Sequence, residues 1–234
     1  ELLEWCAQQG FDRVVDNPEA LREQLVRRCS TRGWSEWVAP LEHWLLALIR
    51  TPLSLQRDSD EQSSLAGLTS LRPELEFWFE SRNVQVARLD QLVTRHTLNG
   101  ADRPRVEEKR FNGMLKGFID LVFEHNGQYY VLDYKSNALG ESDSAYTDQA
   151  MGEAILDKRY DLQYVLYLLA LHRLLKARLP DYDYDRHVGG AVYLFLRGIE
   201  APGNGAFVDK PPRTLIEQLD ALFDGDTLDG EVAA

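Results

Sequence analysis

The fold is decided by two apolar stretches on either side of a turn: Gly117-Phe118-Ile119-Asp120-Leu121-Val122-Phe123 and Val131-Leu132-Asp133-Tyr134-Lys135-Ser136. The turn, His125-Asn126-Gly127-Gln128, contains Asn-Gly, which is the strongest short-range signal for a β-hairpin because both residues tolerate a positive φ. If Asn126 and Gly127 form a two-residue loop, His125 pairs with Gln128. The sequence therefore predicts a hairpin over roughly residues 111–135.

This hairpin places an aspartate of one strand opposite an aspartate of the other. Counting outward from the turn sets Asp120 across from Asp133, on one face and with Cβ atoms about 4.5–5.5 Å apart. Lys135 lies on the same face two residues later. Strand interiors are depleted in Asp, and either carboxylate taken singly could be a satisfied structural group. Because two facing carboxylates repel each other unless a proton or a cation lies between them, we predict a metal site.

The residue types in this cluster suit phosphodiester hydrolysis. Hard divalent ions such as Mg²⁺ are bound by one or two carboxylates together with water and phosphate oxygens, and we expect Ca²⁺ or Mn²⁺ to substitute in binding. A metal at this place lowers the pKa of bound water and neutralises charge on the phosphodiester. Lys135 supplies the point charge that orients the attacking water and stabilises the pentavalent transition state.

The composition restricts the class of protein. The 234 residues, 44% of them hydrophobic, suffice for one well-packed domain with extensions. No run approaches the roughly 18 apolar residues of a transmembrane helix. Cys6 and Cys29 lack the spacing of metal ligands, so we expect reduced thiols and a cytoplasmic location. The net charge of −12 is opposite to that of an autonomous nucleic-acid binder. Either the substrate is not a polyanion, or metal ions and partner subunits overcome the repulsion.

The remaining elements follow from apolar periodicity. Residues 1–50 have helical spacing, with Pro40 in a first turn or at a kink. Their apolar stripe, which we expect to face the core, consists of Trp34, Trp37, Leu41, Trp44, Leu45 and Leu48. Elsewhere the sequence predicts a polar loop over 56–69, a strand over 74–80, a loop near 99–104, a helix over 157–179, a strand over 187–197, a helix over 214–223 and a frayed acidic tail from 225.

Both faces of the hairpin are apolar. One face carries Ile119, Leu121, Phe123, Tyr130 and Leu132, and the other carries Val122, Tyr129 and Val131. A sheet that is apolar on both sides is covered by helices on both sides, which predicts an α/β fold with a mixed central sheet flanked by helices. The predicted organisation is a helical N-terminal extension over 1–70 packed on the core, a core over 71–225 and a tail over 226–234.

Asp120, followed by Asp133-Tyr134-Lys135, resembles the signature of the PD-(D/E)xK nuclease superfamily. The wider strings Gly113-Met114-Leu115-Lys116-Gly117-Phe118-Ile119-Asp120 and Leu132-Asp133-Tyr134-Lys135-Ser136-Asn137 resemble the C-terminal nuclease domain of its RecB branch. The similarity continues through residues 144–147, 160–164 and 189–198. It covers about residues 70–225 and extends more faintly to the N-terminal helices.

The resemblance implies roles for individual residues. It places a metal on Asp120, Asp133 and the backbone carbonyl of Tyr134, and it makes Lys135 catalytic. Its Gln-x-x-x-Tyr motif matches Gln163 and Tyr167, which share a helix face. That pair is open to two interpretations, a polar patch that caps the core or a support for the site that touches its groups or DNA.

An acidic residue on an early strand of the family corresponds to Glu76. Two interpretations stay open for it as well. It belongs to the active site, or strand alternation turns it to solvent because Leu75 and Phe77 face the other way.

The function that the resemblance implies is a Mg²⁺-dependent deoxyribonuclease of the exodeoxyribonuclease V type. It cuts single-stranded or unwound DNA fed by an attached motor during double-strand break repair and recombination in the bacterial cytoplasm. The implied partners are the RecC and RecD subunits and RecA. The alternatives are a module that binds or loads RecA, and a catalytically weak scaffold, although a scaffold has no reason to keep two facing carboxylates.

One ligand of the family is missing from this pattern. The family has an upstream histidine ligand on a helix, and Glu1-Leu2-Leu3-Glu4 falls at or just after its position. None of the five histidines has that setting. We therefore expect weaker metal binding than in the intact enzyme.

Overall fold

The computed structural model describes residues 1–56, 62–203 and 205–225. As predicted, the first fifty residues are helical. They form α1 (Leu2–Gln9), α2 (Phe11–Asp16), α3 (Pro18–Ser30), a short 3-10 turn η1 (Ser35–Trp37) and α4 (Val38–Arg50). Pro40 lies in the first turn of α4, where its missing N–H leaves no bond unmade. Within the described residues, no helix is both long and apolar enough to cross a membrane.

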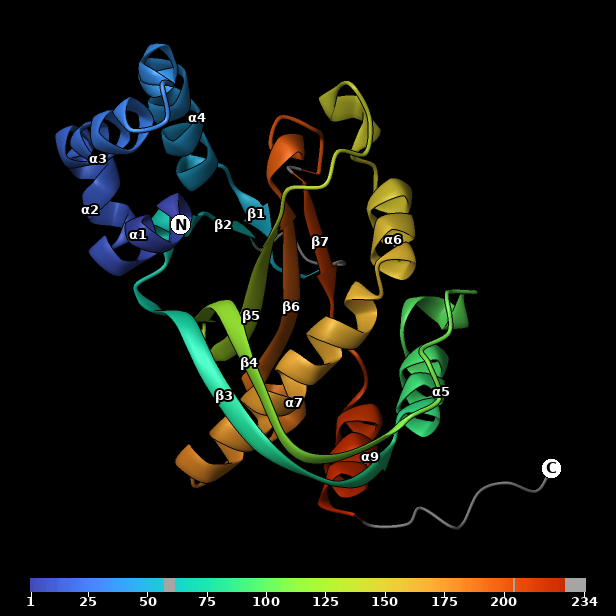
Figure 1. Ribbon diagram of the computed structural model, residues 1–234. Coiled ribbons are helices and arrows are strands. Elements are labelled where there is room, and N and C mark those ends of the chain that lie inside the picture. The colour runs from blue at the N-terminus through green and yellow to red at the C-terminus, as the bar shows by residue number, and fades with distance from the viewer. Residues whose placement is uncertain (57–61, 204, 226–234) are drawn as a thin grey trace.

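A mixed five-stranded sheet forms the centre of the molecule (Figure 1). Its spatial order is β3 (Ser70–Gln85), β4 (Arg110–His125), β5 (Gln128–Lys135), β6 (Val188–Phe195) and β7 (Ala206–Asp209). Neighbouring strands are antiparallel except β5 and β6, which are parallel. A small sheet of β1 (Leu53–Ser54) and β2 (Gln62–Ser63) lies apart from it. The other helices are α5 (Val86–His96), α6 (Asp148–Asp157), α7 (Tyr160–Arg178), α8 (Tyr184–His187) and α9 (Arg213–Asp224).

Helices cover both faces of the sheet, as predicted. One face packs against α5, α6, α7 and α9 through a core that includes Val131 and Tyr193. The other packs against α1–α4 through a second core that includes Leu132 and Val192. Figure 1 shows the N-terminal helices and α7 on opposite sides of the strands. The predicted α/β class with a mixed central sheet is confirmed.

Strands β3 and β4 run beyond the sheet as a long curved ribbon (Figure 1). Where the ribbon joins the sheet, Glu74 has a φ of 48°, and no backbone pair forms between Pro73↔Leu121 and Leu75↔Ile119. The core-facing side of β4 changes at this point, because Ile119 packs in the first core and Leu121 in the second. The prediction that Ile119 shares a face with Leu121 was therefore wrong.

Two other predictions about helices also need correction. Trp34 and Trp37 are 55% and 53% exposed rather than part of a core-facing stripe, because α4 begins only at Val38. The helix predicted over 157–179 is present as α7 but begins only at Tyr160, since Arg159 adopts a left-handed conformation between α6, which ends at Asp157, and α7.

Several helices and strands were not predicted, and two predicted segments lie partly outside the residues that the structure describes. Sequence periodicity did not predict α5, most of α6, or β7. The predicted loop over 56–69 contains β2 and a 3-10 turn at Leu65–Gly67 in which Leu65 is buried, while residues 57–61 lie outside the described part. The predicted tail lies outside it from residue 226 onward.

Candidate active site

The hairpin of β4 and β5 has the predicted register. Asn126 and Gly127 have positive φ, and the antiparallel pairs run from His125↔Gln128 to Leu121↔Leu132. Beyond Leu121↔Leu132 the two strands diverge and no further backbone pair joins them. A side-chain hydrogen bond connects them instead. The carboxylate of Asp120 accepts the backbone N–H of Tyr134 at 3.0 Å. Asp120 is therefore attached to β5 next to Asp133, at the point where the ladder ends.

Asp133 and Lys135 form a buried ion pair on β5. Their carboxylate and ammonium are 2.6 Å apart, and both side chains are less than a tenth exposed. The pKa of Asp133 is raised to about 6, chiefly by burial and also by the negative charge of Asp120, while Lys135 lowers it. Removing two like charges from water makes a cation at this place favourable.

The ammonium group of Lys135 is enclosed by side chains from α7 and β6. It donates to Gln163 Oε1 at 2.8 Å, and it lies 3.7 Å from the ring centre of Tyr160 and 4.5 Å from that of Tyr193. Cation–π contacts of this kind hold a buried ammonium without neutralising it. Lys135 is thus fixed in position by packing as well as by Asp133.

The amide of Gln163 is oriented by two tyrosines. Its Nε2 donates to the hydroxyl of Tyr167, and its Oε1 accepts from the hydroxyl of Tyr193, each at 2.8 Å. Burial, together with the charge of Asp133, raises the pKa of Tyr167 to about 12, so its hydroxyl stays neutral. The Gln163–Tyr167 pair thus contacts Lys135 directly, which is the arrangement that the supporting interpretation requires.

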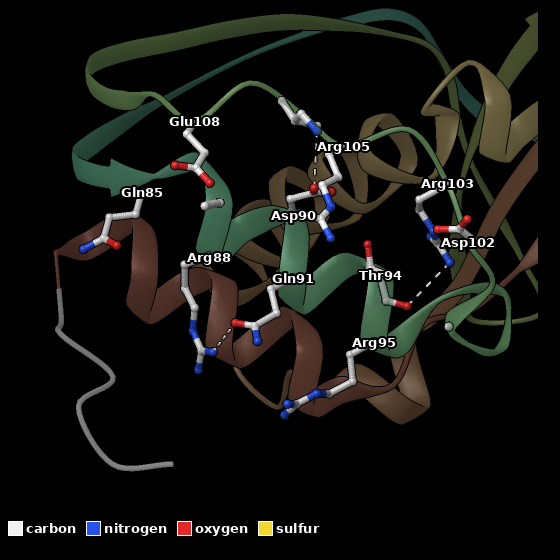
Figure 2. A pocket seen from close by; sticks show the side chains of 13 residues that line it. Gln85, Arg88, Asp90, Gln91, Thr94, Arg95, Asp102, Arg103, Arg105 and Glu108 are labelled. Carbon is white, nitrogen blue, oxygen red and sulfur yellow. Dashed lines mark hydrogen bonds between the residues drawn. The ribbon is translucent and has the colours of Figure 1, made fainter. Parts of the chain in front are cut away.

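The first turn of α7, which carries Gln163, is anchored by a buried ion pair. Arg103 donates to Asp161 at 2.8 Å, and the two side chains are 2% and 0% exposed. Figure 2 shows Arg103 at the edge of a cavity of about 780 Å³ between α5 and the segment that follows it. None of the predicted site residues lines this cavity. The cavity is connected to the site only through Arg103, whose ion pair with Asp161 holds the first turn of α7.

Sequence reasoning missed a carboxylate beside the site. Glu74, at the change of face in β3, hydrogen-bonds the carboxyl of Glu4 on α1, and this bond together with the charge of Asp120 raises the pKa of Glu74. Glu74 stands in line with Asp120 across the two strands, between the pairs Pro73↔Leu121 and Leu75↔Ile119. Tyr160 and Tyr193 were missed as well, although Tyr193 is directly opposite Asp133 in the parallel register of β5 and β6.

Glu76 lies outside the group around Lys135. Its side chain is 42% exposed, with Lys116 at 2.7 Å and the indole N–H of Trp78 at 2.5 Å. The hydrogen bond from Lys116 lowers the pKa of Glu76. The structure thus shows the exposed alternative for this residue.

The donors near Asp120 and Asp133 fit a hard divalent ion. Both side chains offer carboxylate oxygens, which are the donors that such an ion prefers. Among the described residues, no set of three or more His, Cys, Asp and Glu side chains has a metal-binding arrangement. With two carboxylates as ligands, the other coordination positions of the ion would be filled by a carbonyl, by water and by substrate oxygens, as is usual for Mg²⁺.

A mixed sheet that presents Asp, Asp and Lys at the divergence of two strands defines the class of this domain. The chain belongs to the PD-(D/E)XK nuclease superfamily, whose model matches residues 2–225. Members of this superfamily are metal-dependent nucleases.

The chain is similar to RecB subunits of the RecBCD enzyme. It is 45% identical over 223 residues to the RecB subunit of Escherichia coli K12, covering 94% of this chain and 18% of that protein. It is 40% identical to the Haemophilus influenzae subunit over 187 residues, which cover 78% of this chain and 15% of that protein. The Mycobacterium tuberculosis H37Rv subunit is 39% identical over 126 residues, which cover 50% of this chain and 12% of that protein. The chain spans less than a fifth of these relatives, and the predicted resemblance to the RecB branch is confirmed.

Proposed function

We propose that this domain hydrolyses phosphodiester bonds of DNA with Mg²⁺, as the nuclease part of a RecB-like helicase–nuclease in double-strand break repair and recombination. The observation that carries the proposal is the enclosed ammonium of Lys135, held by Asp133 and Gln163 beside Asp120. An ammonium fixed next to two carboxylates combines a cation-binding place with a donor for the substrate.

Asp120, Asp133 and the backbone carbonyl of Tyr134 are the groups that would hold the ion. When bound, Mg²⁺ supplies an activated water and neutralises charge on the scissile phosphate. Lys135 donates hydrogen bonds to the attacking water or to a phosphate oxygen. Because its position is already fixed by Gln163 and by the two tyrosine rings, little reorganisation is needed as charge develops.

The proposed substrate is a single strand, or unwound duplex, delivered by a motor. The net charge of −12 supports delivery by other parts of the assembly, since a chain of this charge attracts DNA poorly by itself. The RecBCD name of the relatives supports RecC and RecD as partners in the bacterial cytoplasm. Contact with RecA remains a prediction, which a pull-down of RecA with the Asp133→Asn variant tests apart from cleavage.

The test of the proposed function is the Asp133→Asn variant, which keeps the shape of the side chain and an acceptor for Lys135. We expect cleavage of labelled single-stranded DNA in Mg²⁺ to be lost while circular dichroism stays unchanged. Asp157→Asn is the matched control, because Asp157 is 65% exposed on α6 and outside the site. Retained cleavage by Asp133→Asn would exclude this mechanism.

A further inference from the structure

The outer face of the β3–β4 ribbon exposes large apolar side chains. Trp78 is 56% exposed, Phe118 is 49% exposed and Met114 is 56% exposed. The opposite face of the ribbon does the packing, since Phe77 and Phe79 lie against the first core. A cluster of exposed rings that the fold does not bury is characteristic of a binding surface.

Four residues of the outer face form one unit, which we call the ribbon platform: Glu76, Trp78, Lys116 and Phe118. In the antiparallel register Trp78 is opposite Lys116, and Glu76 is opposite Phe118. The ammonium of Lys116 lies 4.5 Å from the ring centre of Trp78 and 4.9 Å from that of Phe118. Glu76 binds both Lys116 and the indole of Trp78. The two rings are therefore held in place around a cation.

The platform lies next to the candidate active site along β4. Met114, Lys116 and Phe118 lie on the outer face of the ribbon, and Asp120 follows two residues after Phe118, at the point where the strand changes its core-facing side. At about 3.4 Å per residue, Phe118 and Asp120 are separated by about 7 Å along the strand. This distance is close to the span of one nucleotide, so a chain that stacks on Phe118 reaches Asp120 with its next phosphate.

We propose that the ribbon platform binds single-stranded DNA and guides it to Asp120 and Asp133. Bases stack on the rings of Trp78 and Phe118, and Lys116 contacts a phosphate. Stacking requires a free base face, which a single strand offers and a paired duplex does not. This inference rests on the proposed nuclease function and assigns the surface that holds the single strand beside the site.

The charge of the platform favours this occupant over a duplex held by its backbone. Glu76 pairs with Lys116, and Glu80 on the same strand pairs with Arg82, so the face carries little net charge. Binding that depends mainly on phosphate neutralisation needs a dense positive surface. Ring stacking with one cation suits a single strand, for which each stacked base contributes substantially.

The experiment measures binding of fluorescein-labelled oligothymidylate to the full chain in Ca²⁺ by anisotropy, and cleavage in Mg²⁺. We expect Trp78→Ala and Phe118→Ala each to weaken oligothymidylate binding by about tenfold. In cleavage they should raise KM with little change in kcat. Trp78→Phe should restore most of the affinity, because a ring is kept. The control is Trp37→Ala, since Trp37 is equally exposed but lies on the N-terminal helices.

Three outcomes would overturn the inference. Unchanged oligothymidylate affinity in both alanine variants removes the stacking role. An equal loss of affinity for blunt duplex shows that the surface does not select single strands. Equal weakening by Trp37→Ala shows a general effect of exposed tryptophans. Failure of the nuclease proposal is read separately, from cleavage by Asp133→Asn, because the anisotropy assay does not depend on cutting.

Discussion

Lys135 Nζ on β5 lies 2.8 Å from Gln163 Oε1 on α7, so a strand and the helix packed on it jointly hold one ammonium group. The helix residue is 28 positions away in the sequence. This contact makes the position of Lys135 depend on how α7 docks on the sheet. Variants in α7 are therefore expected to alter the chemistry without touching a carboxylate.

Replacing Gln163 with Leu keeps the volume of the side chain but removes the acceptor for Lys135. We expect kcat for single-stranded DNA to fall by about 10–100-fold, as is usual when a supporting partner of a catalytic group is lost. KM should change little, because Gln163 orients Lys135 rather than binding DNA. Gln149→Leu, on the exposed surface of α6, is the control. A Gln163→Leu enzyme with the parent kcat would show that Asp133 alone positions Lys135.

Replacing Tyr167 with Phe removes the group that receives the amide N–H of Gln163. The amide is then held only through its oxygen, so we expect a smaller loss of kcat than for Gln163→Leu. The combined variant should lose no more than Gln163→Leu alone, because both changes act through one bond. Stopped-flow cleavage of the four proteins gives the coupling. Fully additive losses would mean that Tyr167 acts on the substrate independently.

The buried pair of Arg103 and Asp161 should dominate the stability of the α7 anchor. We expect Asp161→Asn to lower the free energy of unfolding by about 3–5 kcal/mol, since it leaves a buried guanidinium without its charge partner. Urea denaturation measures this change. The exposed pair of Arg186 and Asp181 is the comparison, and Asp181→Asn should cost less than about 1 kcal/mol. Similar values for the two variants would contradict the assigned role.

Stability at acid pH should depend on Asp220 of α9. A hydrogen bond with His172, together with bonds from Arg173 and Lys176, holds the pKa of Asp220 well below its usual range. A carboxyl with a depressed pKa in the folded state adds stability above its unfolded pKa of about 4, and this stability is lost as the pH falls toward the folded value.

Asp220→Asn should therefore destabilise the protein at pH 7 by about 1–3 kcal/mol. The difference from the parent should shrink progressively below about pH 4. Urea unfolding at several pH values checks both statements, with Asp157→Asn as an exposed control. A difference that is independent of pH would show that Asp220 acts through packing alone.

Addition of Mg²⁺ or Ca²⁺ should raise the Tm of the parent protein. An ion that binds only the folded state stabilises it by about 2.7 kcal/mol at a hundred times its Kd. Asp120→Asn and Asp133→Asn should show a much smaller shift, whereas Asp157→Asn should respond like the parent. Equal shifts in all four proteins would place the ion elsewhere on this acidic chain.

The hairpin and its carboxylates were predictable because the information is local. The Asn126-Gly127 turn fixes the register as far as Leu121↔Leu132, which is one pair short of Asp120 and Asp133. Counting therefore brings the two aspartates to the same end of the hairpin, but Asp120 bonds the backbone of Tyr134 instead of pairing with Asp133. The strand period failed at Ile119, since alternation assumes an uninterrupted ladder and Glu74 breaks it with a left-handed backbone. No local sequence pattern predicts a positive φ at a glutamate, because this conformation is uncommon for residues other than glycine.

The rest of the site depends on contacts between distant segments. Residues 86–109 separate β3 from β4, so no short turn exists from which the position of Glu74 could be counted. Tyr160 and Tyr193 reach Lys135 only through the docking of α7 and the parallel pairing of β6. Trp34 and Trp37 had the spacing of a buried stripe, but helical spacing has no meaning where the helix has not yet begun.

The change of face at Glu74 marks the boundary between the ribbon and the sheet, and the two parts are constrained by different contacts. The register inside the sheet is set from the opposite end, at the Asn126-Gly127 turn, so the pairs of β4 with β5 do not depend on the cross-strand pairs farther out than Leu75↔Ile119. The inner face of the ribbon is tied to the first core, whereas its outer face is free of that constraint. Substitutions on the outer face should therefore change how DNA is held while keeping the same reaction.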